Sequence, residues 1–351
     1  MKIAIDAREL EGRPTGVGRF LGELLAAWKT MPEAQAHEFT LLAPQGKDVG
    51  TFWEQIDLPK LVRAAHADVL FSPGYTGPVW LRVPMVVAIH DVSFAAHPEW
   101  FSWREGTRRR AVTLLAARTA KRIITISEFS KREIVAHLGV DGSKVSVVYP
   151  GVTSFGAGRP FPGRHTVLFV GSIFNRRHVP ELIDGFARLA RTRPDVQLEI
   201  VGDNRTSPRI DVQSLVQATG VGDRIHLRSY VPDSELRTLY AESAAFVFLS
   251  EYEGFGLTPL EALAAGLPVL LLDTPVAREV CGDAAAYVKR ADPILIEETL
   301  RSLLFDPVSR ERILRAARDV LPRYSWTTCA GRVLKVLAEA GSDGPQVSST
   351  R

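Results

Sequence analysis

Two glutamates flank a glycine-rich turn in the second half of the chain. Residues 250–266 read SEYEGFGLTPLEALAAG, so Glu253 and Glu261 stand eight positions apart. Carboxylates accept hydrogen bonds from hydroxyl groups, and two of them across a turn could hold the hydroxyls of a sugar or a ribose. The sequence therefore offers Glu253 and Glu261 as candidate binding residues for a polyhydroxylated ligand.

The residues between the two glutamates predict the start of a helix. An apolar strand pattern ends at Ser250, and Thr258 followed by Pro259 has the residue types of an N-cap and a first helical residue. Gly266 is expected to end the helix. Because the first N–H groups of a helix lack an acceptor within it, they favour a phosphate. Here those groups would belong to Gly256, Leu257 and Thr258.

Both glutamates also have an ordinary structural interpretation. Glu261 comes three residues after Thr258, which is the spacing of a capping box. Glu253 lies in the turn, where a solvated carboxylate is common. Local sequence alone leaves a structural role and a binding role open for each glutamate.

The whole segment resembles the donor-binding signature of the retaining glycosyltransferases of family 4. By that resemblance, Glu253 contacts the donor sugar and Glu261 contacts the nucleotide ribose. The turn is expected to contact the donor through Phe255, Gly256, Leu257 and Thr258. The resemblance also implies the GT-B fold, an α/β architecture of two Rossmann-like domains that face each other across a cleft.

A second resemblance lies in residues 166–186, TVLFVGSIFNRRHVPELIDGF, which are similar to the first strand, loop and helix of the family's C-terminal domain. An Arg-Lys-Asn type triplet is usual in that loop, and its basic pair binds the donor diphosphate. This chain has Arg176, Arg177 and His178 instead. Arginine stays charged and binds phosphate bidentately, so we expect this pair to bind the donor diphosphate as well. The ordinary alternative is an exposed arginine pair.

The N-terminal half matches the family as well. Residues 5–20 resemble its first strand and the glycine-rich loop that faces the diphosphate, which makes Gly16 and Gly18 expected donor contacts. A dinucleotide fingerprint fits poorly, because Leu21 takes the place of the third glycine. His90 follows an apolar strand pattern, and in similar enzymes this histidine hydrogen-bonds the transferred sugar. A lone histidine is otherwise more often structural.

Two further segments follow the family's order. Residues 123–133 resemble its strand-to-helix turn, with Ser127 as the N-cap. Asp233 and Glu235 are expected to begin a helix and to lie in the region that meets the nucleobase. Their ordinary role would be to complement the helix dipole. The resemblance spans nearly the whole chain.

The domain organisation follows from the pattern of apolar runs. Short apolar runs alternate with amphipathic segments in both halves, as in β-α-β units around a parallel sheet, and the glycine- and proline-rich residues 151–164 interrupt that pattern. We predict an acceptor-binding domain over 1–155 and a nucleotide-sugar-binding domain over 156–322. Residues 323–351 are predicted to form a helix that crosses back to the N-terminal domain, followed by a flexible tail.

Composition and charge restrict the function classes. The 351 residues carry 43 basic and 40 acidic side chains, so no overall positive field favours nucleic acid. Two cysteines form neither a disulfide framework nor a metal spacing, and no Asp-x-Asp pair occurs. We therefore expect no metal and no cofactor besides a nucleotide diphosphate sugar as co-substrate. The absence of a signal-peptide pattern predicts a cytoplasmic protein.

Basic charge is concentrated in one segment. Residues 101–132 hold nine basic residues against Glu105 and Glu128, directly after an aromatic cluster of Trp100, Phe101 and Trp103. This combination predicts peripheral contact with the anionic inner face of the cell membrane, or with a lipid-linked acceptor, through residues 100–122. The alternative is a solvated helix that packs inward through Ala111, Leu114 and Leu115.

These observations favour a retaining glycosyltransferase that moves a hexose to a polysaccharide, glycolipid or lipid-linked acceptor. Likeness to short O-antigen-type mannosyltransferases makes GDP-mannose the preferred donor, with UDP- and dTDP-sugars open. Two alternatives share the architecture: a sugar-nucleotide 2-epimerase, and a non-catalytic partner subunit that binds nucleotide only. Acceptor specificity is expected in N-terminal loops such as residues 72–77.

Overall fold

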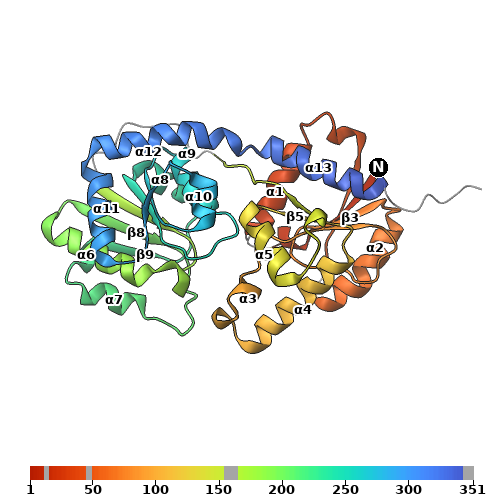
Figure 1. The fold of residues 1–351 in the computed structure, drawn as a ribbon, viewed down its shortest axis with the longest axis horizontal. Helices are drawn as coiled ribbons and strands as arrows, with labels where there is room; N and C mark the ends of the chain where they lie inside the picture. Colours follow the sequence, from red (N-terminus) through yellow and green to blue (C-terminus); the bar gives the residue numbers. More distant parts are fainter. Residues whose placement is uncertain (12–15, 45–49, 154–164, 343–351) are drawn as a thin grey trace, which may run out of the picture. The chain divides into compact units, whose positions relative to one another are not determined.

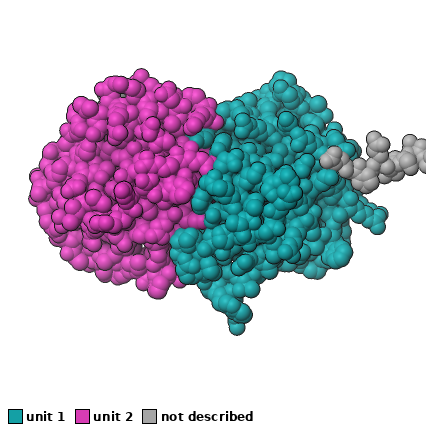
Figure 2. Space-filling view, viewed as in Figure 1, with its two compact units in different colours: residues 1–151, 324–351 teal, residues 152–323 magenta. Residues whose placement is uncertain are grey.

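The computed structural model describes residues 1–11, 16–44, 50–153 and 165–342 (Figure 1). Contacts divide the chain into two compact units, shown in different colours in Figure 2. Unit 1 contains Met1–Gly151 together with the segment that begins at Tyr324, and unit 2 contains Val152–Arg323. The sequence places the corresponding boundaries at residues 155 and 322, and most of the expected linker at 151–164 lies outside the described residues.

Unit 1 is built on a six-stranded sheet in which all paired strands are parallel. The strand order is β2-β1-β3-β4-β5-β6. The strands are β1 (Lys2–Asp6), β2 (Glu38–Leu42), β3 (Val69–Ser72), β4 (Met85–Ala88), β5 (Arg122–Thr125) and β6 (Val145–Val147). Strands β3 and β4 are buried along their whole length, which explains why they read as continuous apolar runs.

Helices cover this sheet and connect its strands. They are α1 (Gly16–Trp28), α2 (Leu58–Ala64), α3 (Ser93–Ala96), α4 (Trp103–Thr119), α5 (Glu128–Leu138) and α13 (Trp326–Ser342). Short helical turns are η1 (Arg8–Leu10), η2 (Ala34–Ala36), η3 (Trp53–Asp57), η4 (Pro98–Trp100) and η5 (Gly142–Lys144). Helix α13 packs on α1 and on the sheet, and the indole Nε1 of Trp28 donates to the Ala330 carbonyl at 3.0 Å. The end of the described chain therefore belongs to the core of unit 1.

Unit 2 has a second six-stranded parallel sheet, with the order β12-β11-β10-β7-β8-β9. Its strands are β7 (His165–Val170), β8 (Val196–Val201), β9 (Ile225–Arg228), β10 (Ala245–Phe248), β11 (Val269–Leu272) and β12 (Ala286–Val288). Its helices are α6 (Val179–Thr192), α7 (Val212–Ala218), α8 (Asp233–Glu242), α9 (Leu257–Ala264), α10 (Pro275–Cys281), α11 (Pro293–Phe305) and α12 (Pro307–Val320). Short turns are η6 (Asn175–Arg177), η7 (Gly222–Arg224) and η8 (Leu321–Arg323).

The two sheets confirm the α/β class predicted from the alternation of apolar runs and amphipathic segments. In such sheets the loops after the carboxyl ends of the strands form the ligand-binding edge. In unit 2 this edge includes the loop between β7 and α6 and the loop between β10 and α9. These two loops contain the arginine pair and the first of the two glutamates.

Candidate functional site

Helix α9 begins earlier than the sequence predicts. Its N-cap is Gly256, in the left-handed conformation with φ of 100°, and Leu257 is its first residue. The prediction of Thr258 as N-cap and Pro259 as first residue is therefore wrong. Because glycine has no Cβ, it adopts this conformation without strain and allows the helix to start two residues sooner. The backbone N–H groups of Leu257 and Thr258 still belong to the first turn, where a helix favours an anion.

The capping-box interpretation of Glu261 is wrong as well, because Thr258 lies inside the helix and is not its N-cap. Glu261 is instead buried at 2% exposure, and the Tyr240 hydroxyl donates to its Oε2 at 3.3 Å. Phe255 is also buried, at 3% exposure, just before the helix. A glutamate kept in the interior of a helix has a defined position, as a binding residue would require.

Arg177 and Glu253 form an ion pair that links the two loops of unit 2. The Arg177 Nε donates to Glu253 Oε1 at 2.8 Å, and its Nη2 lies 2.7 Å from the same oxygen. The Arg177 Nη1 donates to the Ser172 carbonyl at 2.9 Å, and the Ser250 hydroxyl donates to Glu253 Oε1 at 2.9 Å. Three of the five N–H donors of the guanidinium thus face these partners, which leaves two for a ligand.

Two aromatic rings and a glycine position the side chains of Arg176 and Arg177. The Arg177 guanidinium carbon lies 4.8 Å from the Phe248 ring centre, and that of Arg176 lies 4.2 Å from the Phe174 ring centre. Cation–π contacts of this kind hold a guanidinium without using its N–H donors. A Cβ at Gly171 would stand 2.7 Å from Arg177 Nη1, so the close approach depends on this glycine.

A second ion pair joins the same two loops through His178. Its Nε2 lies 2.8 Å from Glu251 Oε1, its Nδ1 lies 3.4 Å from Glu181 Oε1, and the Glu251 N–H donates to the Arg176 carbonyl at 2.9 Å. Hydrogen bonding to Glu181, assisted by Glu251, raises the pKa of His178. With φ of 50°, His178 is the N-cap of α6. It replaces the usual Asn, a residue that tolerates this conformation.

Nucleotide-sugar affinity is expected to depend on the protonation of His178. The charged imidazole binds Glu181 and Glu251 more strongly than the neutral one and so holds the two loops together. The affinity for the nucleotide sugar should therefore be high below the raised pKa of His178 and fall as the pH rises through it. We expect Kd to increase roughly threefold to tenfold from about pH 6.5 to about pH 8.5. Isothermal titration with a nucleotide sugar, whose phosphates do not titrate in this range, measures the change.

His178→Asn is expected to give a flat profile over the same pH range. His165→Asn is the matched control, because His165 lies at the first residue of β7, away from the two loops, and pairs with Asp195 at 2.8 Å. It should keep the wild-type profile. A wild-type profile in His178→Asn would contradict the role of this histidine.

A cavity of about 780 Å³ opens beside the arginine loop in unit 2. The ends of β8 and β9 line it with Gly202, Asp203, Arg228 and Ser229, and Ile173 joins it to the arginine loop. Arg228 is held by Glu199, at 2.8 Å from Nε, and by Glu235, at 2.8 Å from Nη1. Asp233 begins α8 as predicted and is exposed, but it is not among the residues that line the cavity.

In unit 1, His90 comes two residues after the end of β4 and is 8% exposed. Its Nε2 lies 2.9 Å from the Pro73 carbonyl, which can only accept, so Nε2 carries the proton. Burial lowers the pKa of His90, which favours the neutral imidazole. Its Nδ1 can then only accept, and the predicted contact with a sugar hydroxyl would have to use that atom.

The two glycines expected in a diphosphate-facing loop lie in a helix. Gly16 is the first residue of α1 and Gly18 is buried within its first turn. The loop expectation is therefore wrong for these two residues, and residues 12–15 before them lie outside the described part of the chain. Their contact with the donor stays a prediction.

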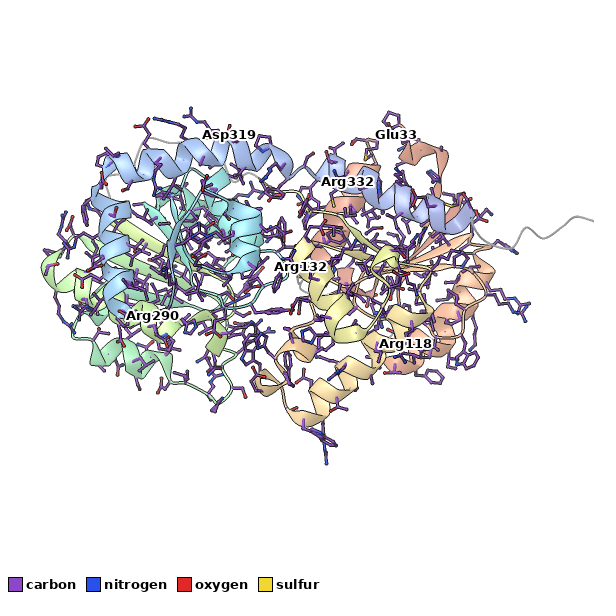
Figure 3. All side chains as sticks on the ribbon, in the orientation of Figure 1. Glu33, Arg118, Arg132, Arg290, Asp319 and Arg332 are labelled. Carbon is purple, nitrogen blue, oxygen red and sulfur yellow. The ribbon has the colours of Figure 1, made fainter. Side chains whose placement is uncertain are left out.

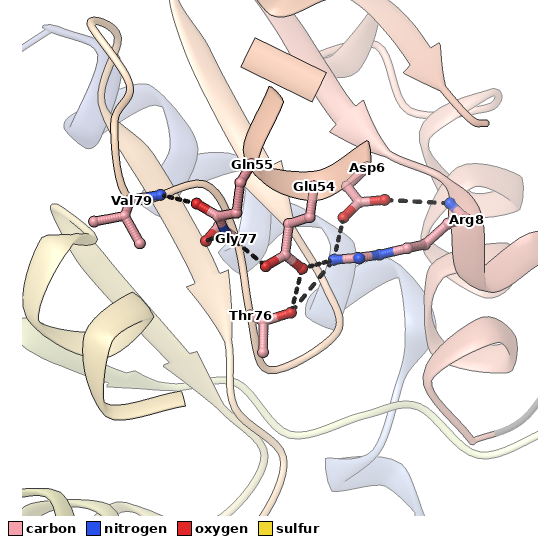
Figure 4. Close-up of polar contacts among 7 residues, drawn as sticks. All are labelled: Asp6, Arg8, Glu54, Gln55, Thr76, Gly77 and Val79. Atoms are coloured by element: carbon pink, nitrogen blue, oxygen red, sulfur yellow. Dashed lines mark hydrogen bonds and ion pairs between the residues drawn. The ribbon is translucent and has the colours of Figure 1, made fainter. Parts of the chain in front are cut away.

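Sequence reasoning missed a buried polar network at the carboxyl end of β1 (Figure 4). The Arg8 Nη2 lies 2.9 Å from Asp6 Oδ2 and also contacts Glu54, and the Thr76 hydroxyl donates to Glu54 Oε2 at 2.5 Å. Gln55 extends the network, since its Oε1 accepts from the Val79 N–H at 2.9 Å. These bonds hold the segment after β3, which includes the expected acceptor loop at 72–77.

Burial raises the pKa of the Asp6 carboxyl from its ordinary 3.8 to about 6. An unfolded chain therefore loses this proton at lower pH than the folded one, and stability falls as the pH rises from about 4 to about 6. We expect Asp6→Asn to gain stability relative to wild type over that interval, by up to about 2 kcal/mol. Urea unfolding of both proteins at several pH values measures the difference, and a difference that does not change with pH would contradict it.

Comparison with known proteins identifies the class to which this chain belongs. The family described as Glycosyl transferases group 1 matches residues 154–320, and Glycosyltransferase Family 4 matches residues 28–154. The chain belongs to these families and is a glycosyltransferase with the GT-B fold.

Individual relatives agree with that class. The chain is 28% identical to glycogen synthase of Mycobacterium tuberculosis, over 93% of this chain and 79% of the relative. It is 25% identical to the O-antigen chain mannosyltransferase RfbU of Salmonella typhimurium, over 83% and 79% respectively. The crystal structure of Anabaena HepE in complex with UDP-glucose matches with a TM-score of 0.76 at 18% identity, over 97% of this chain and 100% of that chain. This last likeness shows the fold.

Proposed function

We propose that the protein is a retaining glycosyltransferase that moves a hexose from a nucleotide diphosphate sugar, with GDP-mannose as the preferred donor. The observation that carries the proposal is the arrangement of two loops in unit 2, where Arg177 contacts Glu253 beside the first turn of α9. One loop supplies two guanidinium groups for a diphosphate, and the other supplies a carboxylate for sugar hydroxyls. The cavity beside the arginine loop has room for the nucleoside.

The proposed chemistry relies on charge stabilisation. The bond between the anomeric carbon and the diphosphate breaks, and the acceptor oxygen bonds to that carbon on the same face. A donor phosphate oxygen takes the acceptor proton. Arg176, Arg177 and the first N–H groups of α9 stabilise the negative charge that grows on the departing diphosphate, as preorganised donors do at other oxyanions. No side chain of the protein is assigned as a base.

Relatives leave the donor open between two hexoses. RfbU and the α-(1→4)-mannosyltransferase of Mycolicibacterium hassiacum, which is 27% identical over 74% of this chain and 60% of that protein, are named for mannose transfer. Glycogen synthase and the UDP-glucose complex of HepE support glucose instead. The mannosyltransferase resemblance of the sequence favours mannose.

A panel of GDP-, UDP- and dTDP-sugars tests this proposal through slow donor hydrolysis followed by NMR. We expect GDP-mannose to react fastest and to release the α-anomer first. Release of a C2 epimer would favour an epimerase of the same fold, and nucleotide binding without any turnover would favour a non-catalytic subunit. Release of the β-anomer first would contradict retention.

We further propose that unit 1 contacts an anionic membrane through α4 and the residues around it, 100–122. Five arginines and one glutamate lie on α4, Trp103 is 80% exposed, and Leu115 is 43% exposed. The alternative in which Ala111, Leu114 and Leu115 pack inward is right for Leu114, which packs against the core, and wrong for Ala111 and Leu115, which are exposed. Gly106, Thr113, Ala116 and Ala117 are the buried residues of this helix. Among the described residues no helix is long and apolar enough to cross a bilayer.

Co-sedimentation with anionic vesicles at low salt tests this contact. We expect binding to vesicles that contain phosphatidylglycerol and none to pure phosphatidylcholine, because arginines attract anionic lipid. The proposal would be contradicted if the protein sedimented equally with both vesicle types, or if it sedimented with neither of them.

A further inference from the structure

A second cavity, of about 420 Å³, lies in unit 1 at the edge of the sheet where β4 and β5 begin. The segment 78–85 forms one side, and Thr119, Ala120 and Lys121, which follow α4, form the other. Lys144, from η5, completes the lining. This edge is opposite to the carboxyl ends of the strands, so the cavity is separate from His90, and among its lining residues Val79 also belongs to the network around Asp6. We call it the basic cavity.

The charged groups of the basic cavity are all cations. They are Arg82, Lys121 and Lys144, and none of the described residues that line it is acidic. The Lys144 Nζ donates to the Ala117 carbonyl at 2.9 Å and to the Arg118 carbonyl at 2.8 Å. These two bonds fix the ammonium at the cavity wall and use two of its three N–H donors. Burial lowers the pKa of Lys144, and an anion in the cavity would restore it.

The rest of the lining is apolar and continues onto an exposed surface. Val79, Leu81 and Val83 contribute to the wall, and Trp80, between them in sequence, is 86% exposed. On the other side the cavity reaches the end of α4, where Leu115 is one turn before Thr119. Arg118, labelled in Figure 3, lies in this last turn. A cationic centre bordered by exposed apolar side chains matches the chemistry of an anionic lipid headgroup with its acyl chains.

We propose that the basic cavity binds the phosphate of an anionic membrane lipid. Arg82, Lys121 and the remaining N–H of Lys144 contact the headgroup, and Trp80 and Leu115 contact the interfacial region of the bilayer. The inference rests on the membrane contact proposed above and gives it a defined binding site. The α4 arginines provide long-range attraction to the membrane, whereas the cavity provides a saturable site.

The test uses dihexanoyl-phosphatidylglycerol below its micelle concentration, with binding to the full chain measured by isothermal titration. We expect saturable binding with one lipid per chain, weakened at least about tenfold in the Arg82→Ala/Lys121→Ala variant, because two charge-assisted contacts are lost. The matched control is Lys29→Ala/Lys335→Ala, which removes the same charge from two exposed sites, one directly after α1 and one on α13. This control should bind the lipid like wild type.

Each other outcome overturns the inference. Equal weakening in the control variant would show that only net charge matters. Binding to vesicles without binding to the monomeric lipid would leave surface attraction by α4 as the explanation. Full competition by inorganic phosphate at the same concentration would show a simple anion site without selectivity for lipid. Donor hydrolysis by the Arg82→Ala/Lys121→Ala variant should equal that of wild type, which separates this test from that of the glycosyl transfer.

Discussion

Arg177→Ala is expected to lower kcat/KM for glycosyl transfer by about a hundredfold to a thousandfold, because removing one preorganised donor to a developing oxyanion has effects of this size. Two N–H donors of Arg177 remain for the diphosphate after its contacts with Glu253 and Ser172. The variant loses both those donors and the partner of Glu253. Steady-state kinetics with the donor found by the sugar-nucleotide panel measures the loss.

Two further variants make this result specific. Arg177→Lys keeps the charge but cannot reach Glu253, Ser172 and a phosphate together, so we expect an intermediate loss. Arg290→Ala removes an exposed arginine of the same unit, labelled in Figure 3, whose partner is Asp292 at 3.3 Å. That variant should keep wild-type activity. A near-normal rate in Arg177→Ala with an unchanged unfolding midpoint would show that Arg177 does not stabilise the departing diphosphate.

Much of the fold could be predicted because each buried strand leaves a direct mark on the sequence. A strand such as β10 or β11 is buried on both faces and therefore reads as a continuous apolar run. Amphipathic helices between these runs then require a parallel sheet. Helix α8 begins at Asp233 as expected, because a proline before it and acidic residues in its first turn are strong start signals.

The start of α9 was harder to predict because two kinds of signal compete there. Thr258 and Pro259 have the residue types of a helix start, but Gly256 can take the left-handed conformation that initiates the helix earlier. Sequence patterns record which residue types a position prefers. They do not record which of two neighbouring helix starts leaves the Glu261 side chain buried. Packing around Tyr240 decides between the two starts.

Contacts between distant residues could not be predicted at all. Arg8 and Glu54 are 46 residues apart, and Arg177 and Glu253 are 76 apart. Nothing in the local sequence of either pair announces its partner, because the sheet order alone brings them together. His178 is similar, since its residue type gives no sign that Glu251 will stand beside it. The resemblance named Arg177 and Glu253 separately, and the structure adds that they are in contact.

This contact makes a second large effect testable, since Glu253→Gln should lower kcat/KM by roughly a hundredfold even though the side chain keeps its size. The amide removes the charge that holds Arg177, and it also weakens the predicted contact with the sugar hydroxyls. Glu253 Oε1 accepts from Ser250 and from Arg177 at the same time, so one substitution disturbs both loops. The unfolding midpoint should change little, because the ion pair is partly exposed.

A double-variant cycle then decides whether the two residues act together. If Glu253 both positions Arg177 and contacts the sugar, the variant with both Arg177→Ala and Glu253→Gln should be slower than Arg177→Ala alone, but by less than the loss that Glu253→Gln causes in the wild type, because the first substitution has already removed the contact between the two side chains. Fully multiplied losses would show instead that Glu253 does not act through Arg177. We expect the coupled result, since the guanidinium reaches Glu253 through two nitrogens. An unaffected rate in Glu253→Gln would assign this glutamate to the solvated surface of the turn.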